Sequence, residues 1–146
     1  MKLYAETSAV LAWLFGESAG HAVHRHLAEA ELVISSDLTL VECERVLIRA
    51  QTVAGVTEAQ AADRRAVLNR AAAHWHLLHL HKEVIERARR PFPSEPIRTL
   101  DALHLSTALL GRSAVPGLFL LSLDERIRKN AQGLGFDLVP DRSGNR

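Results

Sequence analysis

The feature of this sequence that most constrains its fold is the alternation of short apolar runs with longer helical patterns. Strand-like runs occupy residues 2–5, 32–35, 76–80, 118–122 and 136–139, and stretches typical of helices fill the intervals between them. Strands joined through helices pair in parallel, and a parallel sheet is buried on both of its faces. The alternation therefore predicts an α/β fold in which helices cover both faces of a parallel sheet.

Polar residues in front of the apolar stretches indicate where helices begin. Thr57 and Gln60 have the spacing of a capping box, and Ser36 and Asp37 precede another predicted helix. We expect the Thr7–Ser8 pair and Thr99 to cap two further helices. The length predicts a single domain over residues 1–140, followed by a loose polar tail over residues 141–146.

Composition excludes several classes of protein. Hydrophobic residues make up 47% of the 146 residues and charged residues 24%, which is typical of a globular chain. No apolar run approaches the roughly 18 residues of a membrane span, and we expect no signal peptide. Cys43 is the single cysteine, so no internal disulfide is possible and the cytoplasm is the expected compartment. The net charge of +1 does not by itself indicate nucleic-acid binding.

Four acidic residues stand near the predicted ends of strands or starts of helices. Glu6 directly follows the first strand-like run, and Asp124 follows the fourth. Asp101 lies in the first turn of a predicted helix, and Glu42 lies one turn inside another. Because parallel sheets bind ligands beyond the carboxyl ends of their strands, we expect these carboxyl groups to converge.

Carboxylates that converge repel one another unless a cation neutralises them or their pKa values rise. Mg²⁺ and Mn²⁺ prefer oxygen ligands, polarise phosphoryl oxygens and lower the pKa of bound water. One or two such ions could hydrolyse a phosphodiester by in-line attack. The hydroxyl groups of Ser8 and Ser122 could contribute to the same cluster.

Each acid also has a structural interpretation, which the sequence leaves open. Asp101 and Asp124 could cap a helix or interact with its dipole. Glu42 could pair with a nearby arginine. An acid directly after an apolar strand is harder to explain without a ligand, so Glu6 favours a site more strongly than the others do.

Other kinds of metal or phosphate site fit the sequence less well. Aspartyl-phosphate phosphatases need an Asp nucleophile with a second Asp two residues later, whereas Ser8 stands two residues after Glu6. No Gly-rich loop follows the first strand-like run. The four histidines between residues 74 and 81 lack neighbouring zinc motifs. We interpret His104 as a packing or hydrogen-bonding residue and Cys43 as a buried structural thiol.

Four segments resemble, in order along the chain, the motifs of PIN-domain ribonucleases. Residues 4–11 (YAETSAVL) resemble the opening strand, turn and helix, and residues 36–42 (SDLTLVE) resemble the second motif. Residues 100–108 (LDALHLSTA) match the third motif most closely, and residues 121–127 (LSLDERI) resemble the fourth. The resemblance covers about residues 2–140, and the ordered set is more specific than any single motif.

The resemblance implies a three-layer α/β/α sandwich with a central parallel sheet of about five strands. It also implies a Mg²⁺- or Mn²⁺-dependent endoribonuclease. Members of the VapC toxin type are usually homodimers, act on RNA and are blocked by a VapB-like antitoxin. Carried over motif by motif, the metal-binding and catalytic acids are Glu6, Glu42, Asp101 and Asp124, and the supporting polar groups are Ser8 and Ser122.

The first motif departs from the family pattern, because Glu6 stands where PIN domains usually have Asp. The change displaces the carboxylate by one methylene group, and metal sites are sensitive to ligand placement. We favour a pocket adapted to Glu6. The alternative is a weakly active or inactive PIN domain that binds RNA or protein.

Basic residues flank three of the acidic motifs. RNA binding needs positive charge near the pocket, so we expect a basic rim that contacts phosphates. The alternative is that these residues belong to solvated helix faces. The candidates are Arg45, Arg49, Arg87, Arg89, Arg90, Arg98, Arg126, Arg128 and Lys129.

Overall fold

The computed structural model describes residues 1–142 and contains a five-stranded sheet in which all neighbouring strands are parallel. The order across the sheet is β3-β2-β1-β4-β5. The predicted parallel α/β fold is therefore confirmed. The strands are β1 (Lys2–Ala5), β2 (Leu32–Ser36), β3 (His76–Leu78), β4 (Phe119–Leu121) and β5 (Leu138–Val139).

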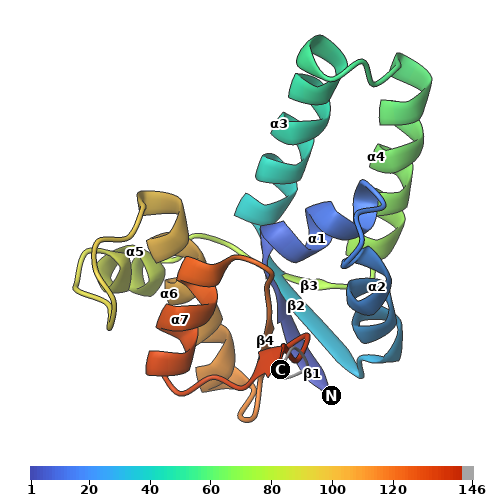
Figure 1. The fold of residues 1–146 in the computed structure, drawn as a ribbon. Helices are drawn as coiled ribbons and strands as arrows, with labels where there is room; N and C mark the ends of the chain where they lie inside the picture. The colour runs from blue at the N-terminus through green and yellow to red at the C-terminus, as the bar shows by residue number, and fades with distance from the viewer. Residues whose placement is uncertain (143–146) are drawn as a thin grey trace.

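Helices cover both faces of the sheet, which confirms the expected three layers. Figure 1 shows α1 and α2 on one side of the strands and α5, α6 and α7 on the other, while α3 and α4 form a hairpin that extends beyond the sheet. The helices are α1 (Thr7–Leu14), α2 (Gly20–Glu29), α3 (Asp37–Val53), α4 (Glu58–Ala72), α5 (Lys82–Ala88), α6 (Thr99–Ala114) and α7 (Glu125–Gly133).

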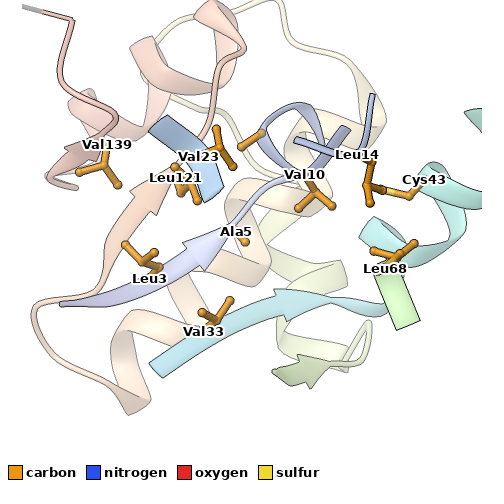
Figure 2. Packing of buried hydrophobic residues seen from close by; sticks show 11 residues of the cluster. Leu3, Ala5, Val10, Leu14, Val23, Val33, Cys43, Leu68, Leu121 and Val139 are labelled. Atoms are coloured by element: carbon orange, nitrogen blue, oxygen red, sulfur yellow. The ribbon is translucent and has the colours of Figure 1, made fainter. Parts of the chain in front are cut away.

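Successive residues of the central strand point to opposite faces of the sheet. Leu3 and Ala5 belong to one buried cluster, in which they pack with Val10 of α1 (Figure 2). Tyr4, between them, belongs to a second cluster with Leu105 of α6. A strand that is apolar on both faces needs helices on both sides, which explains the layered arrangement.

The capping box at the start of α4 is confirmed. Thr57 Oγ1 accepts the N–H of Gln60 at 3.1 Å, and Gln60 Oε1 accepts the N–H of Thr57 at 3.0 Å. Ser36 is the N-cap of α3, where its hydroxyl accepts the N–H of Leu38 at 3.1 Å.

Two of the expected caps are wrong. Thr7 is already the first residue of α1, and Glu6 is the N-cap residue without a side-chain capping bond. Thr99 lies inside α6, whose N-cap is Arg98. Helix α6 continues through Gly111, where an added Cβ would lie 3.3 Å from the Leu118 side chain.

Strand β1 lies at the centre of the sheet. Strands β2 and β3 lie on one side of it, and β4 and β5 lie on the other, so the strand order reverses at β1. In such sheets, ligands bind at this point, beyond the carboxyl ends of the strands. Over residues 1–142, no helix is long and apolar enough to cross a membrane. The predicted end of the domain at residue 140 stays a prediction, and residues 143–146 of the predicted tail lie outside the described residues.

Candidate active site

Glu6 lies at the carboxyl end of the central strand, and only 4% of it is exposed. Its backbone N–H donates to the Leu121 carbonyl at 3.0 Å, which extends the pairing of β1 with β4. Ser122 donates a hydrogen bond of 2.7 Å to Glu6 Oε2, and Ser8 donates to the same oxygen. The structure thus brings together three of the predicted site residues.

Asp124 is attached to this group through the backbone. The N–H groups of Leu123 and Asp124 donate to Ser8 Oγ at 2.9 and 3.1 Å. Asp124 Oδ1 accepts the N–H groups of Arg126 and Ile127 at 2.9 and 3.0 Å, so the capping interpretation of this acid is confirmed. Within residues 1–142, both of these capping bonds fall on Oδ1.

Glu42 is held by a second group of buried polar residues. Thr7 donates a hydrogen bond of 2.8 Å to Glu42 Oε1, and Nε2 of His104 bonds to the same oxygen. The Tyr4 hydroxyl lies 3.2 Å from Nδ1 of His104. Burial, with the charges of Glu6 and Glu42, raises the pKa of Tyr4 well above its ordinary value, so the hydroxyl keeps its proton.

The pKa values of Glu6 and Glu42 are shifted in opposite directions from their ordinary value. Burial raises the pKa of Glu6, and the charge of His104 and the bonds from Ser8 and Ser122 only partly oppose this. Burial also raises the pKa of Glu42, but the hydrogen bond and charge of His104 outweigh it and hold the pKa below the ordinary value. Glu42 is therefore the more readily ionised of the two.

Asp101 is half-buried in the first turn of α6. Burial raises its pKa, and the charge of Asp124 raises it further, while Arg98 and His104 act in the opposite direction. Two carboxylates that disfavour each other's charge are stabilised by a cation between them.

A divalent metal ion needs carboxylate ligands that lie close together. Over residues 1–142, no three His, Cys, Asp or Glu side chains converge closely enough to form a ligand group. The assignment of all four acids as metal ligands therefore stays a prediction, and Glu42 is bonded to Thr7 and His104. Mg²⁺ commonly takes one or two carboxylates and keeps several waters, and the Asp101–Asp124 pair fits that pattern.

The expected basic rim needs one correction. Arg128 is buried, and its guanidinium donates to the carbonyls of Ser122, Val139 and Pro140 at 2.8 to 3.2 Å. It anchors the end of β4 rather than facing solvent. The candidates that are exposed are Arg45, Arg49, Arg89, Arg90, Arg98, Arg126 and Lys129.

The other candidate ligands are accounted for structurally. The four histidines between residues 74 and 81 are exposed, and His79 pairs with Asp37. Cys43 is fully buried, as predicted. His104 has the predicted hydrogen-bonding role. Sequence reasoning missed Tyr4 and Thr7 as its partners, and the signal for Tyr4 was a phenol within an otherwise apolar strand.

Comparisons with known proteins identify relatives over most of the chain. The PIN domain family matches residues 3–133. Ribonuclease VapC46 of Mycobacterium tuberculosis is 33% identical over 137 residues, which cover 94% of this chain and 95% of that protein. Ribonuclease VapC35 of the same species is 34% identical over 56 residues, or 38% of this chain and 42% of that protein.

Solved structures share the fold. A toxin–antitoxin complex from Klebsiella pneumoniae contains a chain that superposes with a TM-score of 0.60 at 19% identity, covering 92% of this chain and 93% of that one. The crystal structure of Mycobacterium tuberculosis VapC20, described as a sarcin–ricin loop cleaving toxin, gives a TM-score of 0.60 at 17% identity, covering 92% and 96%.

Proposed function

The chain belongs to the PIN domain family, and on that premise we propose that it is a metal-dependent endoribonuclease that hydrolyses RNA phosphodiester bonds. The name of its relative, Ribonuclease VapC46, supports cleavage of RNA. One observation carries the proposal. Glu6 is a buried acid fixed by two serine hydroxyls at the carboxyl ends of β1 and β4, where Asp124 follows directly.

Asp101 and Asp124 would hold Mg²⁺ or Mn²⁺, and Glu6 and Glu42 would complete the acidic pocket around the ion. A bound Mg²⁺ would polarise a phosphoryl oxygen and favour the ionisation of water. The coupling of Asp101 to Asp124, which raises the pKa of Asp101, supports this assignment, because Arg98 and His104 only partly offset the repulsion.

The remaining residues would position the acids. Ser8 and Ser122 fix one oxygen of Glu6, which leaves the other oxygen directed away from the serines. Thr7 and His104 keep Glu42 in place and ionised at neutral pH. Exposed arginines beside the site would bind the phosphates of the RNA strand.

We further propose that the protein is the toxin of a toxin–antitoxin pair in the cytoplasm. The VapC names of its relatives and the toxin–antitoxin complex among the similar structures support this role. Its partners would be a VapB-like antitoxin and a second copy of the chain in a homodimer.

The test is cleavage of total cellular RNA by the purified protein with Mg²⁺, with Mn²⁺ and with EDTA, beside an Asp101→Asn variant. We expect cleavage that needs the metal and is lost in the variant, with an unchanged circular dichroism spectrum. Cleavage that persists in EDTA, or in Asp101→Asn, would contradict the assigned chemistry.

A further inference from the structure

We propose that the hollow between α5 and α6 binds one nucleotide of single-stranded RNA, with its base on an apolar floor and its phosphate on an arginine rim. The inference rests on the proposed function and adds the place where the strand is held. The hollow has a volume of about 600 Å³ and is formed by α5, the following loop and the first turn of α6. Ligand sites of roughly 300–1,000 Å³ are typical for molecules of this size.

The chemistry of the walls matches a nucleotide. Ile85, Phe92 and Ile97 give the hollow an apolar floor, and Ile85 is 42% exposed although it is a large hydrophobic residue. Apolar side chains of this kind offer van der Waals contact and burial to the face of a nucleobase. Three arginines line the same hollow and suit a phosphodiester, namely Arg89, Arg90 and Arg98.

The acidic residues that line the hollow are too few to neutralise the positive charge of its three arginines. Glu95 is the one acid among the lining residues that the structure describes. Its two carboxylate oxygens accept the backbone N–H groups of Phe92 and Ile97 at 2.9 and 3.0 Å. Glu95 thus shapes the loop, and the hollow favours an anionic ligand over a cationic one.

The walls are also held in place before any ligand binds. The guanidinium of Arg87 lies 4.2 Å from the centre of the Phe92 ring and donates to the carbonyl of Pro91 at 3.2 Å. On the far side of the loop, Ser94 and Asn130 of α7 exchange two hydrogen bonds of 2.8 and 3.1 Å. A site that is already formed loses little entropy when it binds.

The hollow adjoins the candidate active site. Thr99 and Ala102 line it, and Asp101 stands in the same helical turn. Arg98, on the rim, also lies close enough to Asp101 to favour its ionised form. A strand seated in the hollow would therefore pass next to the acids, so the hollow would select the nucleotide beside the cleaved bond.

Binding can be measured without cleavage. The probe is a fluorescently labelled single-stranded oligoribonucleotide in EDTA, read by anisotropy, beside an abasic strand of equal length. Two variants test the two walls: Ile85→Gln for the floor and Arg90→Gln for the rim. The matched controls are Ile48→Gln on α3, where Ile48 is 40% exposed, and Arg25→Gln on α2, which covers the opposite face of the sheet.

We expect Ile85→Gln to weaken binding of the oligoribonucleotide about tenfold, through lost apolar burial, and to leave the abasic strand unaffected. Arg90→Gln should weaken both strands and lower the salt slope by about 0.7. Wild-type affinity in Ile85→Gln would overturn the inference, even if the protein cleaves RNA. If the protein bound RNA in a base-dependent way but did not cleave it, the nucleotide site would be supported and the proposed nuclease activity would be contradicted. If neither variant changed RNA binding and an acidic peptide bound in the hollow, the hollow would be assigned to a protein partner and the inference would be overturned.

Discussion

Ser122, at the end of β4, donates a hydrogen bond of 2.7 Å to Oε2 of Glu6, at the end of β1. The pairing of β1 with β4 brings the two residues together across the chain. This bond fixes a carboxylate of the site. We therefore expect Ser122→Ala to raise the Mg²⁺ concentration needed for half-maximal RNA cleavage by about 10- to 100-fold. Titration of cleavage with Mg²⁺ measures this, with the exposed Ser113→Ala as control. An unchanged titration would remove Ser122 from the site.

Asp124 caps α7 and is also proposed to hold a metal, and two substitutions separate these roles. Asn can accept the same N–H groups of Arg126 and Ile127, so Asp124→Asn should leave the free energy of unfolding within about 0.5 kcal/mol of wild type. Asp124→Ala should cost about 1 kcal/mol. Cleavage should be lost in both variants. Full activity of Asp124→Asn would reduce this acid to a cap.

Tyr4→Phe tests the buried group that holds Glu42. The variant leaves Nδ1 of His104 without its partner in a buried position, which should lower the free energy of unfolding by about 1–3 kcal/mol. Glu42 keeps its bond from Thr7, so cleavage should fall less than it does in Asp101→Asn. Urea denaturation measures the stability, and an unchanged midpoint would show that the bond contributes nothing.

The sequence was sufficient to predict the sheet and the proximity of Glu6, Ser8 and Ser122. An acid directly after a buried strand indicated that Glu6 lies at the ligand-binding edge of the sheet. Ser8 and Ser122 were expected at the same edge, because each follows the end of a predicted strand. These are local signals, which depend on where a parallel strand ends.

The other half depended on contacts between distant elements. Glu42 bonds to His104 on α6, and nothing near either residue in the sequence predicts that pair. The same holds for Arg128, whose charge indicated a solvated face but whose guanidinium binds three carbonyls at the end of the sheet. Such partners become visible only once the helices are packed.

Cys43 should be inert in the folded protein. Burial, and after it the charges of Glu42, Glu6 and Glu44, raises the pKa of its thiol to about 12. Because the thiolate is the reactive form, we expect no labelling by iodoacetamide near pH 8 and full labelling in denaturant. Labelling of the native protein, read by mass spectrometry, would show that α3 opens.

Glu6→Gln separates the charge of the buried acid from its shape. Burial raises the pKa of Glu6 from its ordinary value of 4.5, so the folded protein binds this proton more tightly than the unfolded chain does. The stabilising contribution is complete below the unfolded pKa and is lost as the pH rises through the folded pKa. In EDTA, the stability of wild type relative to Glu6→Gln should therefore fall as the pH is raised from about 4 to about 7.

Mg²⁺ should reverse that loss, because an ion that binds only the folded state stabilises it. We expect added Mg²⁺ at neutral pH to raise the melting temperature of wild type, and to raise that of Glu6→Gln by much less. Glu6→Asp keeps the charge but draws the carboxylate away from Ser122, so it should respond to Mg²⁺ at an intermediate level. A response to Mg²⁺ that is the same in all three proteins would show that the ion binds elsewhere and that Glu6 is not a ligand.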